Sequence, residues 1–184
     1  MAPGTGLPRS GDVAAWILGA QAARALRDQE KLGTGPIDNG LLARMAAVQK
    51  QALTDKVAGS AISFALDNGV AKGRVVLRSR WETGRRFELA RLLGDRIVAS
   101  ADGRLFPATR AYTYRQKMQR SFAAELLSPF ESVDDMLAGD YSMESQQDVA
   151  ERFQVSELTI RTLLVNHRRL EREDLDEDFN VAAA

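Results

Sequence analysis

The sequence predicts an α+β fold: a small antiparallel sheet packed against a helix bundle that ends in a helix-turn-helix-like pair. Three observations support this prediction. Apolar residues recur at helical spacing in long segments before residue 50 and after residue 83. Between these segments, apolar residues alternate on both sides of a turn signal, as in a β-hairpin. Near the C-terminus, two short helical patterns are separated by a tight turn.

Composition limits the class of protein. The 184 residues fit one domain, or one domain with a small appended subdomain. Lys and Arg together number 25, as do Asp and Glu, so a formal net charge of zero gives no global attraction to nucleic acid or membrane. The chain has no Cys and no apolar run long enough to cross a membrane, and we expect a cytoplasmic protein.

We expect four parts along the chain. The first residues are rich in Pro and Gly and lack the basic-then-apolar order of a signal peptide, so they are interpreted as a flexible leader. The parts are the leader 1–10, a main domain 11–140, a helix-turn-helix-like subdomain 141–170 and an acidic tail 171–184.

The N-terminal third predicts two helices and the start of a hairpin. Asp12 can cap a helix that runs to about residue 31, and Asp38 can cap a second helix that reaches about residue 48. Large apolar side chains then alternate in 61–66, before a turn signal at 67–69 and a returning strand at 74–78. A further strand nearby is consistent with this pattern.

The next predicted helices belong to the main domain. Thr83 can cap a helix that runs to about residue 98, and we expect a loop from 100 to 110. A further helix is predicted from about 111 to 127. Pro129 suits the first turn of a short helix that ends near Gly139.

Two segments of the main domain carry a recognisable pattern, RRFELARLLGD at 85–95 and FAAELLSP at 122–129. Together they resemble the core of the ImmA/IrrE zinc metallopeptidase family. In that family an apolar helix carries His-Glu-x-x-His, and a second helix carries a Glu ligand ahead of Phe-Ala-x-x-Leu-Leu-x-Pro. The resemblance implies a mini-zincin-like fold, in which a sheet edge beside the metal helix can bind an extended peptide. An ordinary half-buried hairpin is the alternative interpretation of that sheet.

The residues that would perform the chemistry are replaced. Arg91 and Asp95 stand where the family has its two His, Leu92 stands at the general-base Glu, and Gln116 stands at the third ligand. A guanidinium has no lone pair for zinc, and a leucine cannot accept a proton from a bound water. The resemblance therefore implies no catalytic residue, no metal and no cofactor at these positions. Arg91 and Asp95 could instead form an i,i+4 salt bridge or line a remodelled ligand pocket. The resemblance also implies that Arg91 faces the segment that holds Gln116, with its guanidinium paired to Asp95 or a neighbouring carboxylate.

The segment 143–170 has the pattern of a helix-turn-helix. A short helix over 147–153, a turn over 154–156 and a helix from 157 to 170 carry apolar residues at the expected positions, and Ser156 can cap the second helix. Its candidate contact residues for a protein partner or nucleic acid are Arg161, His167, Arg168 and Arg169. Glu157 and the acidic tail would repel DNA. Packing on the main domain is the third interpretation. It predicts that Leu158 or Ile160 is buried together with Leu163 or Leu164, and that Arg161, Arg168 and Arg169 remain accessible.

Active members of the family cleave or control helix-turn-helix repressors. The leading functional hypothesis is a catalytically inactive, metallopeptidase-like regulatory protein that binds a protein partner, such as a transcriptional repressor or a toxin-antitoxin component. One alternative is a DNA-binding regulator that uses the C-terminal helix pair. The other is an ImmA/IrrE-like endopeptidase with an unconventional site.

Overall fold

A computed structural model describes residues 13–54, 63–66, 74–98 and 105–172. Within these residues the fold is α+β and mostly helical, as the sequence predicts. The elements are α1 (Ala15–Gln29), α2 (Asn39–Met45), α3 (Gln51–Thr54), β1 (Ser63–Leu66), β2 (Arg74–Val76), α4 (Glu82–Val98), β3 (Leu105–Ala108), α5 (Tyr114–Leu127), α6 (Phe130–Leu137), α7 (Met143–Phe153) and α8 (Glu157–Asn166).

The sheet has three antiparallel strands in the order β2-β1-β3. The hairpin of β1 and β2 confirms the predicted pair of strands, with Phe64 opposite Val76. The segment 105–108 was expected to be part of a loop, and that prediction is wrong, because it forms β3 and pairs with β1. Pro107 argues against a strand in the sequence, because proline is depleted in strands. It is tolerated here because β3 lies at the edge of the sheet.

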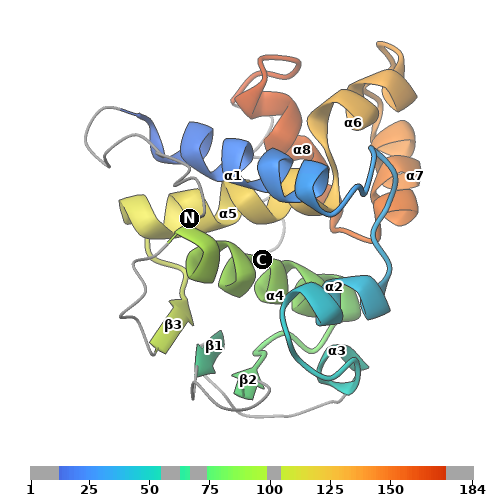
Figure 1. Cartoon of the computed structure of the whole chain (residues 1–184). Helices are drawn as coiled ribbons and strands as arrows, with labels where there is room; N and C mark the ends of the chain where they lie inside the picture. The colour runs from blue at the N-terminus through green and yellow to red at the C-terminus, as the bar shows by residue number, and fades with distance from the viewer. Residues whose placement is uncertain (1–12, 55–62, 67–73, 99–104, 173–184) are drawn as a thin grey trace, which may run out of the picture.

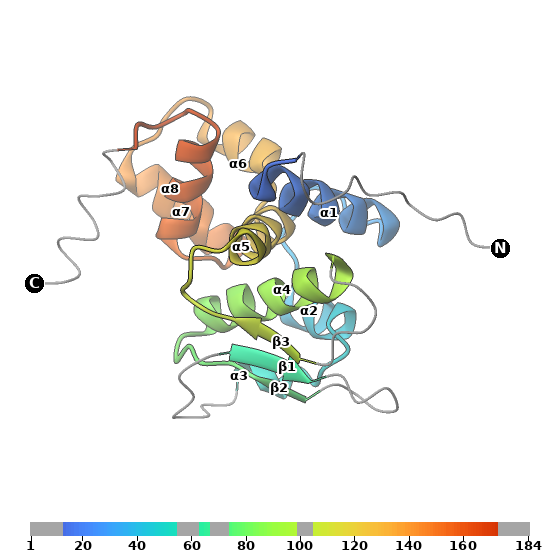
Figure 2. The same ribbon diagram turned by 90° about the vertical axis from the view of Figure 1, so that its left-hand side faces the viewer.

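The main domain is layered. Figure 2 shows the sheet beneath α4, then α5, then α1, while α6, α7 and α8 gather at one end of this stack. In both views α2 lies beside α4 (Figures 1 and 2). The central helix α5 is therefore covered on two sides, and its residues reach both the core and the sheet.

Two glycines let the helices of this stack approach closely. A Cβ atom on Gly19 of α1 would lie 2.3 Å from the carbonyl oxygen of Met118, and one on Gly94 of α4 would lie 2.5 Å from the ring of Phe122. Both distances are shorter than a side chain tolerates. The ring of Phe122 is fully buried, so α1 and α4 pack tightly against α5 at this level.

The predicted caps are partly confirmed. The side chains of Asp38 and Ser156 accept hydrogen bonds from the backbone N–H groups of Leu41 and Thr159. Thr83 does not cap α4, because the helix already includes it. Asp12 and the turn at 67–69 lie outside the described residues.

The C-terminal helix pair packs on the main domain. Gln154 adopts a left-handed backbone with φ of 54° between α7 and α8. Ile160, Leu163 and Leu164 are buried, as predicted, whereas Leu158 is exposed. These residues join the same hydrophobic cluster as α1, α4 and α5, so the described part of 141–170 shares one core with the rest.

Within the described part of the chain, no helix is long and apolar enough to cross a membrane.

Candidate functional site

Two of the positions singled out by the family resemblance meet in the interior. Arg91 lies on the face of α4 that is turned toward α5, and its Nη2 donates a hydrogen bond to Oε1 of Gln116 at 2.5 Å. The predicted contact between these two residues is confirmed. Both side chains are buried.

The guanidinium of Arg91 is held by neutral oxygens. Its Nη2 also donates to the carbonyl oxygen of Thr109 at 2.6 Å and, at 3.3 Å, to Oε1 of Gln119. The expected ion pair with Asp95 is wrong. Arg115 occupies that carboxylate with two hydrogen bonds of 2.7 and 2.6 Å. A two-pronged contact from the facing helix gives a planar guanidinium better geometry than a neighbour one turn along the same helix offers.

The same side chains cover the free edge of β3. Gln116 and Gln119 each donate a side-chain hydrogen bond to the carbonyl oxygen of Pro107, at 3.2 and 3.0 Å. The backbone N–H of Thr109 donates to Oε1 of Gln116 at 3.0 Å. Together with the bond from Arg91 to Thr109, these contacts pair backbone groups that an edge strand would otherwise expose. At this end of β3, an added peptide strand would compete with them.

The residues at this position do not fit a catalytic zinc. Leu92 is buried in the hydrophobic core and has no carboxylate that could act as the general base. The guanidinium of Arg91 lies between the two glutamines, so a metal ion there would face a fixed positive charge. Over residues 13–54, 63–66, 74–98 and 105–172, no group of three or more His, Cys, Asp or Glu side chains could hold a metal ion.

Burial and charge both act on Arg91. Burial, followed by the nearby charge of Arg120, lowers the pKa of Arg91 to about 10, and the opposite charge of Glu88 partly offsets this. The side chain remains a cation at neutral pH, because this value is still well above 7. Its Nε is buried and has no hydrogen-bond acceptor within the part of the chain that the structure describes.

The nearby acids are already engaged by other arginines. Glu88 is buried, accepts a hydrogen bond of 3.0 Å from the backbone N–H of Ser79, and lies 3.6 Å from Nε of Arg78. Asp95 is fully buried and forms an ion pair with Arg115. The site is therefore a polar cluster with cations in excess, which we call the Arg91 cluster (Arg78, Glu88, Arg91, Asp95, Arg115, Gln116, Gln119 and Arg120).

The candidate contact residues do not form one surface, and α8 ends at Asn166, before the predicted end near residue 170, so only Arg161 lies within it. Arg161 is buried against the sulfur of Met143, although it was expected to be accessible. Arg168 and Arg169 are exposed, as predicted. Arg169, however, forms hydrogen bonds of 3.0 and 2.6 Å with the carboxylate of Asp134 on α6. The helix pair thus uses its arginines largely for internal contacts.

His167 is a packed histidine. Its ring stacks on Phe130 with centroids 3.5 Å apart and an angle of 6° between the planes. Burial lowers the pKa of His167, and the charge of Glu125 partly opposes that shift. Burial therefore favours the neutral ring, and His167 packs inside the fold as a structural residue.

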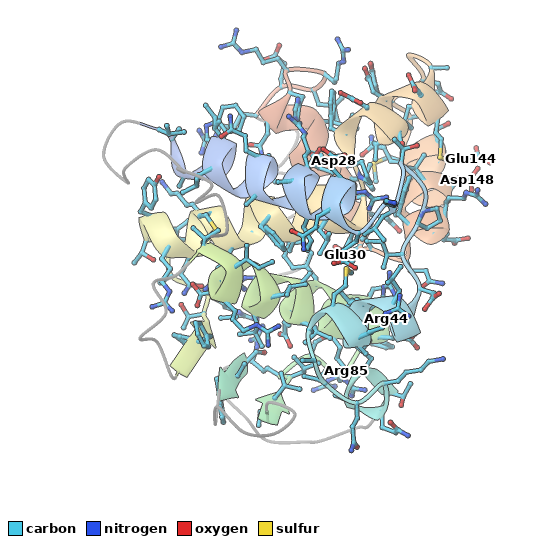
Figure 3. All side chains as sticks on the ribbon, in the orientation of Figure 1. Asp28, Glu30, Arg44, Arg85, Glu144 and Asp148 are labelled. Carbon is cyan, nitrogen blue, oxygen red and sulfur yellow. The ribbon has the colours of Figure 1, made fainter. Side chains whose placement is uncertain are left out.

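The outer side of the helix pair carries acidic residues. Figure 3 shows Glu144 and Asp148 projecting from α7 on the side that faces away from the rest of the fold. Glu151 and Glu157 are exposed as well. A DNA backbone would be repelled by this surface.

Sequence reasoning missed several members of the Arg91 cluster. Gln119 follows Gln116 by three residues on α5, so helical spacing alone would have placed both side chains on one face. Arg120 carries no such signal, because arginines on helices are most often solvent-exposed.

No known protein family and no curated protein sequence matches the chain.

Proposed function

We propose that this chain is a catalytically inactive, mini-zincin-like relative of the ImmA/IrrE metallopeptidases that acts in the cytoplasm by binding a protein partner. The partner is a transcriptional repressor or a toxin-antitoxin component. The observation that carries the proposal is the contact between Arg91 and Gln116. Two positions that the family would use around one ion face each other here, and a guanidinium replaces the metal.

Loss of catalysis follows from the side chains. Peptide hydrolysis by a zinc enzyme needs metal ligands and a base beside the bound water. Arg91 and Leu92 supply neither function, and Asp95 is bound to Arg115. The same absence of a base at this position argues against an endopeptidase with an unconventional site in the Arg91 cluster.

Exposed side chains of the kind found at protein interfaces support a protein partner. Trp81 is 72% exposed, Tyr112 is 80% exposed and Met143 is 53% exposed. Aromatic residues and Met are enriched at the centres of protein interfaces. The acidic outer side of α7, with Glu144 and Asp148, favours a protein over DNA.

A metal-binding experiment tests the proposed ancestry. Equilibrium dialysis against zinc would compare the natural chain with a triple variant, Arg91→His, Asp95→His and Gln116→Glu. We expect no stoichiometric zinc on the natural chain and one zinc per chain on the variant, because the helices already bring these positions together. Folding of both proteins is checked by circular dichroism. A folded variant without zinc affinity would contradict the mini-zincin relationship.

A second experiment tests the partner. The purified full chain is mixed with the repressor or antitoxin encoded beside its gene, with and without EDTA. We expect a complex that survives EDTA and an uncleaved partner. Cleavage of the partner, or a complex that EDTA dissolves, would contradict the inactive-protein proposal.

A further inference from the structure

Arg91 keeps hydrogen-bonding capacity that the protein does not use. All three of its hydrogen bonds to described residues come from one terminal nitrogen, Nη2. Its Nε is buried without an acceptor. Buried donors without partners are rare in folded proteins, and each one calls for an explanation such as a bound water or ion. The unused donor lies in the middle of the Arg91 cluster.

The positive charge of Arg91 also has no carboxylate of its own among the described residues. The two acids whose charges act on it are Glu88 and Asp95. Glu88 is shared with Ser79 and Arg78, and Asp95 makes two hydrogen bonds to Arg115. The oxygens that accept its hydrogen bonds within residues 13–54, 63–66, 74–98 and 105–172 are all neutral carbonyl or amide oxygens.

Like charges surround Arg91. Arg120 and Arg78 both act on it as repulsive neighbours. Arg120 donates to the carbonyl oxygen of Ala111 and lies over the ring of Tyr112, so among the described residues it has no acidic partner either. Four arginines (78, 91, 115 and 120) against two carboxylates (88 and 95) leave the Arg91 cluster with a formal charge of +2.

We propose that the Arg91 cluster is a binding site for an oxyanion, either a carboxylate or a phosphate. Arg91 is the central donor, and Arg120 supplies a second positive charge at the more accessible side. A planar guanidinium matches the oxygens of both groups, and a bound anion would offset the excess charge and accept the unused Nε–H. This inference goes beyond the proposed function, because the site can be occupied whether or not a protein partner binds.

The site is tested by titrating the full-length chain with sodium phosphate and with sodium acetate, at ionic strength held constant with sodium chloride. The readouts are the Nε–Hε signals of arginine in NMR spectra and the midpoint of thermal unfolding. We expect a saturable shift of the Arg91 signal and a rise in the midpoint with at least one of the two anions. Absence of a saturable response to either anion would overturn the proposal.

Two variants and one control locate the effect. Arg91→Met should weaken anion binding by about tenfold or more, because it removes charge-assisted hydrogen bonds. Arg120→Gln, at a partly exposed position, should weaken it by a smaller factor and keeps the test decisive if the first variant does not fold. Arg152→Gln removes the same charge from the exposed side of α7 and should bind like the natural chain. Equal affinity in all four proteins would overturn the proposal.

A pair of peptides identifies the source of the oxyanion. Pentaglycine with a free C-terminal carboxylate is compared with its amidated form, each at the same ionic strength. Arg91-dependent binding of the free acid alone would indicate a carboxylate carried by a polypeptide. Arg91-dependent binding of phosphate without binding of either peptide would indicate a phosphate group.

Discussion

Two buried arginines on α4, Arg86 and Arg91, lie five residues apart and are bonded in different ways. Arg86 has an exposed fraction of 1%, and Arg91 one of 8%. Arg86 uses three nitrogens: Nε donates to the carbonyl oxygen of Gln154 at 3.1 Å, Nη2 to that of Ile37 at 2.6 Å, and Nη1 to the side chain of Asn39. Toward the described residues, Arg91 donates from one nitrogen only and its Nε has no acceptor.

The charges near the two arginines also differ, because acidic groups act on Arg86 and other arginines act on Arg91. Burial lowers the pKa of Arg86, but the charges of Glu82 and Asp38 oppose that shift. The pKa of Arg91 is lowered first by burial and then by the repulsive charge of Arg120. A buried guanidinium in which each nitrogen has an acceptor is a structural connection, whereas one with an unused nitrogen and like-charged neighbours has the properties of a binding site. The following variants test this distinction.

The largest effect is expected at Arg86. Arg86→Met removes the donors of three acceptors that belong to two separate segments, 37–39 and the turn at Gln154, and each unpaired buried acceptor costs roughly 1–3 kcal/mol. We expect the free energy of unfolding to fall by about 4 kcal/mol, measured by urea denaturation. Arg44→Met is the control, because Arg44 lies exposed on α2 (Figure 3) and should change stability by less than about 0.5 kcal/mol. Equal losses in both variants would show that Arg86 is not a structural connection.

The second largest loss of stability is expected at Arg115, which pairs with Asp95 in place of Arg91. Arg115→Gln leaves Asp95 fully buried without its cation, and breaking a buried ion pair in this way is strongly destabilising. We expect a loss of about 2–3 kcal/mol in the free energy of unfolding. Asp95→Asn should cost less, since the arginine side chain is 46% exposed and can be hydrated. If Asp95→Asn costs more, the carboxylate has an additional role, such as pairing with Arg91.

The structure shows which parts of this comparison a sequence can predict. Helix positions, the β1–β2 hairpin and the Ser156 cap depend on neighbouring residues, and their patterns predicted them. The contact of Arg91 with Gln116 came from the family resemblance. The bonding of Arg86 could not be predicted, because its acceptors lie 49 and 68 residues away, at Ile37 and Gln154. Two adjacent arginines in a sequence are more typical of a solvated surface.

The charge pairing in the Arg91 cluster was predicted wrongly for a related reason. Spacing along one helix suggested that Arg91 pairs with Asp95. The outcome depends on how α5 lies against α4, which places Arg115 opposite that carboxylate. The angle between two packed helices is set by many side chains together, so local spacing cannot supply it.

A smaller effect, of opposite sign, is expected at the turn that Arg86 contacts. Gln154 has a φ of 54°, a left-handed conformation that costs a non-glycine residue roughly 1–2 kcal/mol. Gln154→Gly keeps the carbonyl that accepts from Arg86 and relieves this conformation, although glycine gains entropy in the unfolded chain. We expect the free energy of unfolding, measured by urea denaturation, to rise by up to about 1 kcal/mol. A loss of stability would show that the glutamine side chain, and not only its backbone, holds the turn.

The smallest change in stability is expected at Arg91 itself. Arg91→Met removes a desolvated cation together with its repulsion from Arg120 and Arg78, which favours the folded state. Against this, the carbonyl oxygen of Thr109 loses a donor. Oε1 of Gln119 also loses a donor, whereas Oε1 of Gln116 loses Arg91 but still accepts from the backbone N–H of Thr109. These contributions oppose each other, and we expect the free energy of unfolding to stay within about 1 kcal/mol of the natural value. Urea denaturation side by side with Arg86→Met is the measurement. A loss as large as that of Arg86→Met would place Arg91 among the structural connections and remove the basis for treating it as a binding residue.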